Sequence, residues 1–155
     1  ELGAAVARVI YHHLFTTDAG NRLLRRAWKV GITPLERLLC DPLYPACRMA
    51  MMGGLGITPS GPDQGQLAIV DKAFDRVSSL LGDGRKYLCG TDVMTAADLT
   101  FCSLAYPLVL PDEKGSVFVS WADDLPEGFR QEVRKRRESA AGQFVLRVYR
   151  EERNV

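Results

Sequence analysis

One stretch decides the fold of this chain: VMTAADLTFCSLAY, residues 93–106. Thr95 suits a helix N-cap, because its hydroxyl can accept a hydrogen bond from a backbone N–H that has no partner within the helix. Asp98 follows three residues later, where its carboxylate can reach back to the N–H of the cap residue. Met94 and Leu99 have the spacing of a hydrophobic staple across this start. The sequence therefore predicts a helix start with Thr95 and Asp98 as structural N-cap residues.

The rest of this stretch carries no charge. Apolar side chains surround the helix axis from Leu99 to Tyr106, and a helix that is apolar all round is typical of a buried position. Pro107 has no backbone N–H, so we expect the helix to bend or end near Tyr106. The prediction is a buried central helix near residues 95–106.

Apolar residues recur every three or four positions in most other segments, which indicates further helices. These are predicted at residues 2–15, about 18–30, 34–52, 63–81, 126–138 and 140–153, with Thr17 or Asp18 as a cap and with residues 34–52 kinked or divided by Pro42 and Pro45. Residues 53–62 are rich in Gly and Pro and predict a loop. The fold class is all-α: a helical bundle that forms a single domain over residues 1–155.

Residues 117–121 have the composition of a strand, but the chain offers no partner strand. We expect an extended loop there, packed by Phe118 and Trp121. The chain also begins at Glu1 inside a predicted helix, so we expect it to be a fragment or a processed form of a longer protein.

Composition argues against several classes of partner. The formal net charge is +1, which gives no overall attraction to nucleic acid or anionic lipid. The basic run at residues 134–137 spans a full helical turn and is typical of a solvated face. No uninterrupted apolar run approaches the length that crosses a bilayer. We therefore expect neither a nucleic-acid partner nor a membrane span.

The chain has no pattern of metal ligands or catalytic side chains. Its four cysteines show neither a CxxC pair nor metal-ligand spacing, which favours a reducing compartment such as the cytosol or the interior of an organelle; they are Cys40, Cys47, Cys89 and Cys102. His12 and His13 are adjacent, so on a helix they point about 100° apart and cannot easily share one metal ion. We predict no metal site and no catalytic residue.

A family resemblance lies in the second half of the chain. Residues 83–90 read DGRKYLCG and lead to TAADLTF at residues 95–101, with Leu104, Pro107 and Pro111 after it. This order resembles the C-terminal helical domain of glutathione S-transferases, in which a YLxG turn precedes an [ST]AAD N-cap on the buried central helix. Residues 141–153, AGQFVLRVYREER, resemble the ending of one transferase-like group.

The resemblance implies a limited function. In that family, catalysis and glutathione binding reside mostly in an N-terminal thioredoxin-like domain, and nothing in this chain looks like that domain. The chain would be the substrate-pocket half of a transferase-like protein, not catalytically competent alone, and glutathione would be its cofactor only if such a domain is present. The family's first helix in this domain lines the pocket for the electrophilic substrate. By this analogy the substrate-binding candidates are Arg8, Tyr11, His12 and Phe15.

Two other functions stay open. The same domain can be a non-catalytic docking or structural subunit of a larger assembly, or can bind a small molecule without chemistry in the first-helix pocket. A protein partner is expected in the transferase and docking cases: the missing thioredoxin-like domain, a second copy or a larger complex. A docking module predicts an exposed apolar patch. We expect such a patch at residues 117–121 and on the first helix.

Overall fold

The structure is a computed structural model that describes residues 1–61, 63–113 and 117–152, without the side chains of Val117 and Phe118. All regular secondary structure in these ranges is helical, which confirms the predicted all-α class. The elements are α1 (Leu2–Thr16), α2 (Asp18–Trp28), α3 (Pro34–Leu55), α4 (Gln64–Leu81), α5 (Ala96–Val109), α6 (Val117–Ser120), the 3₁₀ turn η1 (Ala122–Asp124), α7 (Glu127–Glu138) and α8 (Ala140–Glu152).

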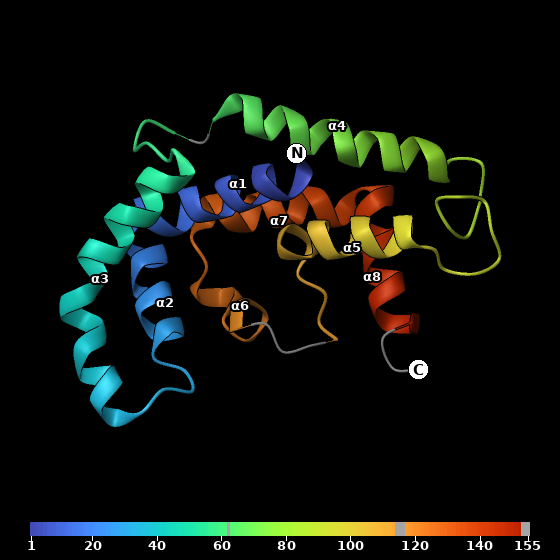
Figure 1. Cartoon of the computed structure of the whole chain (residues 1–155). Coiled ribbons are helices and arrows are strands. Elements are labelled where there is room, and N and C mark those ends of the chain that lie inside the picture. The colour runs from blue at the N-terminus through green and yellow to red at the C-terminus, as the bar shows by residue number, and fades with distance from the viewer. Residues whose placement is uncertain (62, 114–116, 153–155) are drawn as a thin grey trace.

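The core of the bundle forms around α1. This helix contacts α2, α4 and α5, and α8 contacts α4, α5 and α7 (Figure 1). Phe15, Phe74 and Phe129 come from α1, α4 and α7, and all three are buried in one continuous apolar cluster. At one end of the molecule, α2 and α3 form a pair that stands beside this core (Figure 1).

Helix starts follow local capping chemistry. The Thr17 hydroxyl accepts from the Gly20 N–H at 3.0 Å, and the Asp63 carboxylate accepts from the Gly65 N–H at 2.8 Å. Thr33 begins α3 with a capping box in which Glu36 accepts from the Thr33 N–H at 2.8 Å. Each start depends on residues within one turn of the chain, which is why the sequence could predict it.

The central helix differs from its prediction in length and burial. It passes through Pro107 and ends at Val109, because Leu110 adopts a left-handed conformation (φ 50°). It is also buried on one side only: Leu99 is 56% exposed, whereas Phe101 and Ala105 are buried. The prediction of a helix buried all round was wrong, because its neighbours α1, α7 and α8 leave one side uncovered.

The third helix also extends further than predicted. It is one helix through Pro42 and Pro45, and it includes Gly53 and Gly54 before it ends at Gly56. The loop predicted from residue 53 was therefore wrong for its first three residues. Gly56 has φ 65°, the left-handed conformation typical of a helix C-terminus, so the helix ends where this conformation occurs rather than at the first glycine.

The prediction for residues 117–121 also needs correction. Residues 117–120 form the short helix α6 and not an extended loop. The Trp121 ring lies 4.3 Å below the Arg26 guanidinium, which covers it. The predicted packing role of Phe118 and the helix end near Arg153 lie outside the described residues.

The basic run on α7 is not a uniformly solvated face. Arg136 is 3% exposed, forms ion pairs with Asp71 of α4 and Glu132 of α7, and stacks on the Phe74 ring. Arg137 donates to the Leu110 carbonyl at 3.2 Å. Tertiary contacts therefore take Arg136 out of solvent and partly cover Arg137, which the linear sequence does not reveal.

The junction of α7 and α8 requires glycine at position 142. A Cβ atom there would lie 1.9 Å from the Arg136 carbonyl oxygen, because the first turn of α8 approaches the end of α7 so closely. The same measure at Gly54 of α3 finds no atom within 4 Å. These two helical glycines form a matched pair for a test.

We predict that Gly142→Ala lowers the free energy of unfolding by about 1–3 kcal/mol, because the two helices must move apart. Gly54→Ala, the control, should be neutral or stabilise by up to about 1 kcal/mol through its higher helix propensity. Thermal melts followed by circular dichroism measure both. A melting temperature of Gly142→Ala equal to or above that of the unsubstituted chain would contradict the close approach.

Candidate functional site

The start of α5 is held by a buried carboxylate. Asp98 is fully buried, and its Oδ2 accepts from the Thr95 N–H at 2.8 Å and the Thr95 hydroxyl at 2.6 Å. Its Oδ1 accepts from the Leu88 N–H at 2.7 Å. One side chain thus caps α5 and fastens the preceding turn of residues 87–90 to it. Only the contacts with Thr95 follow from local spacing.

These hydrogen bonds keep Asp98 ionised. Burial alone would raise the pKa of the carboxyl, but the bonds from Thr95 and Leu88 outweigh burial and lower the pKa below its ordinary value. The charge also lies at the positive end of the α5 dipole. Asp98 is therefore a fixed anion whose accepting positions are used within the fold.

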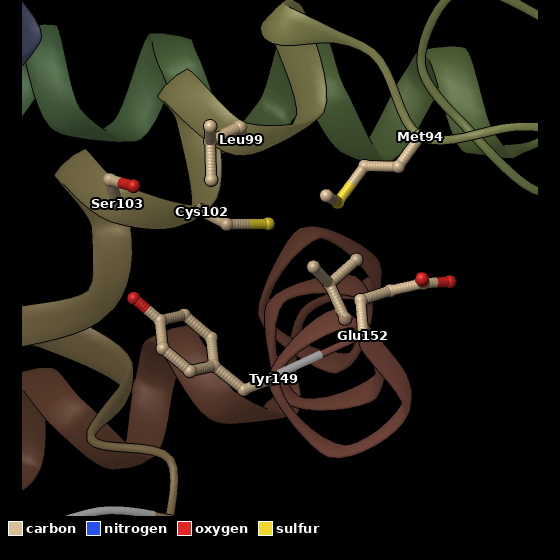
Figure 2. Close-up of a pocket in the computed structure, with 7 residues that line it drawn as sticks. Met94, Leu99, Cys102, Ser103, Tyr149 and Glu152 are labelled. Atoms are coloured by element: carbon tan, nitrogen blue, oxygen red, sulfur yellow. The ribbon is translucent and has the colours of Figure 1, made fainter. Parts of the chain in front are cut away.

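A cavity of about 410 Å³ lies between α5 and the end of α8 (Figure 2). Its apolar lining comes from Met94, Leu99 and Val148. Its other lining residues are Cys102, Ser103, Tyr149 and Glu152. This size is in the range of small-molecule sites, and the lining suits an apolar ligand with one polar end.

The cavity is unsuited to glutathione. Glutathione carries carboxylates, whereas the ionisable side chains among the lining residues include the Glu152 carboxylate and no lysine or arginine. Glu152 also accepts a hydrogen bond from the Tyr87 hydroxyl, which joins the 87–90 turn to α8. An acidic ligand would meet repulsion at this rim.

The thiol in the cavity is not a nucleophile. Burial, with the nearby Asp98 charge, raises the pKa of Cys102 to about 12. Nucleophilic cysteines need the opposite shift, towards a thiolate at neutral pH. All four cysteines are free thiols, and residues 1–61, 63–113 and 117–152 contain no cluster of side chains that could hold a metal ion.

The four candidates on α1 separate into two groups. Arg8 is exposed and Tyr11 is half-buried, whereas His12 is buried and Phe15 is fully buried in the core. Tyr11 stacks on Phe15 with ring centroids 5.3 Å apart. Burial lowers the pKa of His12, although its hydrogen bond with the Thr58 backbone acts the other way. Arg8 and Tyr11 are therefore the pair that a ligand can reach without rearranging the core.

A second cavity is basic. It has a volume of about 530 Å³ and lies between α2 and α3, lined by Arg22, Arg25 and Arg48, with Asp18 as the opposing charge. Arg48 is already engaged, because it donates from Nε to the Phe15 carbonyl at 3.0 Å. The sequence shows Arg22 and Arg25 as one helix face, but the approach of Arg48 depends on how α3 packs.

Several large apolar side chains on α3 are exposed. Its outer face consists of residues spaced alternately four and three apart, all of them exposed: Leu35, Leu39, Pro42, Ala46, Met49 and Gly53. Leu35 and Met49 are 71% and 72% exposed. Monomeric proteins rarely leave such a continuous apolar strip in water. Residues 117–121 and the first helix, where we expected the patch, do not carry this strip.

Comparisons with protein-family models, with curated proteins and with solved structures found no match to this chain. Among the described residues, no helix has both the length and the apolar character needed to cross a bilayer.

We predict that Asp98→Ala lowers the free energy of unfolding by roughly 2–4 kcal/mol, because it leaves the partly buried Thr95 and Leu88 N–H groups without acceptors. Thr95→Ala, which keeps the carboxylate, should cost only about 0.5–2 kcal/mol. Denaturant titration measures both. A smaller loss for Asp98→Ala than for Thr95→Ala would contradict the role of Leu88.

The same carboxylate predicts a pH effect. Because its pKa is lower in the folded than in the unfolded chain, its stabilisation is present above the unfolded value of about 4 and is lost as pH falls through the folded pKa. Asp98→Asn should remove this acid-side component from the stability curve. Denaturation midpoints of the unsubstituted chain and of Asp98→Asn are measured at a series of pH values from about 7 down to about 2, on either side of the ordinary carboxyl pKa. If the two midpoints change with pH in parallel, the expectation is contradicted.

We also predict that Cys102 is the last of the cysteines to be alkylated. At a pKa of about 12, its thiolate fraction at pH 8 is only about one in ten thousand, and its side chain is buried. Cys47 and Cys89 are exposed and serve as internal controls. Peptide mass spectrometry after timed iodoacetamide treatment measures the order. Labelling of Cys102 as fast as Cys89 would contradict it.

Proposed function

We propose that this chain is the C-terminal, substrate-pocket half of a glutathione S-transferase-like protein, with chemistry supplied by a thioredoxin-like domain. The observation that carries the proposal is the Asp98 network. The resemblance rests on a YLxG turn followed by an [ST]AAD cap, and Asp98 hydrogen-bonds both parts, through Leu88 and Thr95. This bonding gives a physical reason for the two motifs to occur at this spacing.

The described side chains support a binding role in that protein. The buried thiol has a raised pKa, and burial, together with the neighbouring His12, lowers the pKa of His13 to about 4. Near neutral pH the Cys102 thiol is therefore protonated, and the His13 imidazole is neutral but only a weak base, with a pKa well below the range that suits general acid–base catalysis at that pH. Arg8 and Tyr11 would face the electrophilic substrate, and a thioredoxin-like domain would bind glutathione.

One observation favours a second candidate, a docking subunit of a larger assembly. The outer face of α3 is the kind of exposed apolar patch that such a module requires. This candidate needs no thioredoxin-like domain. The two candidates therefore differ in what accompanies the chain in its source.

The mass of the natural protein separates them. A transferase-like protein should exceed this chain by roughly 80 residues or more, enough for another small domain, and should be retained on immobilised glutathione and released by free glutathione. This chain alone should pass through the same column. A natural mass equal to that of the chain, without glutathione retention, would reject the transferase proposal and leave the docking subunit.

We predict that Arg8→Ala in a natural protein that proves active raises the KM for an electrophilic substrate by up to about tenfold, the effect of roughly 1.4 kcal/mol of lost binding. Its melting temperature should not change, because Arg8 is exposed. Arg134→Ala, another exposed arginine on α7, is the matched control. An unchanged KM in both variants would remove Arg8 from the substrate pocket.

A further inference from the structure

The outer face of α3 lies directly opposite the side that the helix buries. Tyr44 is the one buried residue of this helix, and its hydroxyl donates to the side-chain Oδ1 of Asn21 at 2.7 Å. With about 100° of rotation per residue, the six residues of the outer face fall about 140–220° from Tyr44. They form a strip about 27 Å long, from Leu35 to Gly53.

All four charged side chains of α3 point away from this strip and have partners within the chain. Asp41 pairs with Lys29 at 2.7 Å, and Glu36 caps the helix at Thr33. Arg48 donates to the Phe15 carbonyl, and Arg37 donates to the Lys29 carbonyl at 3.4 Å. The outer face is thus uncharged. Helices that bind anionic membranes instead carry Lys and Arg along the polar face beside the apolar one.

We propose that the outer face of α3 binds the same face of a second copy of this chain, with the two helices antiparallel. The spacing is symmetric about Tyr44, so a two-fold axis there places Leu35 opposite Gly53, Leu39 opposite Met49 and Pro42 opposite Ala46. Two of these pairs set a larger side chain against a smaller one, Leu35 against Gly53 and Pro42 against Ala46, whereas Leu39 and Met49 are of similar size. Each copy therefore offers Leu35 and Pro42 to smaller residues of the other.

Gly53 provides the room for this pairing. Apart from the adjoining residues and backbone of α3 itself, no atom lies within 4 Å of the position that a Cβ would occupy there, so the space outside Gly53 is open to the partner's Leu35. Two identical surfaces can meet in this way only if they do not repel each other, and an uncharged strip meets that condition. The proposal rests on the docking role of α3 and names its partner.

The interface is small, with one helix from each copy. Contacts of this size lie at the lower end of specific interfaces, so we expect a dissociation constant in roughly the micromolar range. Sedimentation velocity should then detect a dimer at a chain concentration of about 100 µM and a monomer at about 0.1 µM, because these concentrations lie above and below the expected dissociation constant. A chain that is monomeric at the higher concentration would overturn the proposal.

Charge substitution tests the antiparallel register. Leu39→Glu and Met49→Lys each place a charge on the outer face, and each variant alone should sediment as a monomer at about 100 µM, above the micromolar range expected for the interface. An equimolar mixture of the two should form dimers again, because position 39 of one copy faces position 49 of the other. A mixture that stays monomeric would overturn this register, and dimers in both single variants would overturn the use of this face.

Val93→Glu is the matched control. Val93 is 69% exposed and apolar, and it belongs to the loop before α5. Figure 1 shows this loop and α3 at opposite ends of the molecule. This variant should dimerise like the unsubstituted chain. Circular dichroism melts confirm that each variant is folded, which is expected because the substituted side chains are exposed.

The docking role is tested apart from self-association. If the chain is monomeric but Leu39→Glu reduces the assembly size of the natural protein in its source, α3 still docks and only the second copy is refuted. If Leu39→Glu changes neither the self-association of the chain nor the assembly size of the natural protein, the docking role itself fails.

Discussion

The ionised Asp98 carboxylate is the interaction on which the described second half of the chain depends. It is buried, so its charge is tolerated only because Thr95 and Leu88 supply hydrogen bonds. Those bonds fix the direction in which α5 starts and hold the 87–90 turn against it. Tyr87 is then buried and donates to Glu152, which brings the end of α8 to the same place. The α5–α8 cavity forms at this junction.

Arg136 has a comparable role in the other half of the bundle. Its guanidinium pairs with Asp71 and lies over the Phe74 ring, so α7 and α4 are joined through a charged group that is almost fully buried. Buried ions require such partners, because an unpaired charge in the interior is costly. Next to it, Gly142 lets α8 begin close against the α7 backbone. Polar contacts and a missing side chain therefore set how the last two helices pack.

The sequence predicted what depends on neighbouring residues. Thr95 with Asp98 marks a helix start within a single turn, and the periodicity between Asp63 and Leu81 identifies α4. Helix ends were less predictable, because proline and glycine weaken a helix without always ending it. The α5 helix continues past Pro107, and α3 continues until Gly56 adopts a left-handed conformation. The contact of Leu88 with Asp98 and the burial of Arg136 join residues that local patterns do not pair.

The outer face of α3 shows why periodicity alone does not say which side of a helix is buried. The apolar residues of α3 repeat as a core-facing stripe would, but the chain turns this stripe outward and anchors the helix through Tyr44 and its charged side chains. Burying one Leu or Met side chain contributes about 1.5–3 kcal/mol. Leu35, Leu39 and Met49 therefore leave several kcal/mol of hydrophobic stabilisation unrealised in a single copy. The same hydrophobic effect that holds α1 in the core makes this face of α3 a surface that favours contact with another apolar surface.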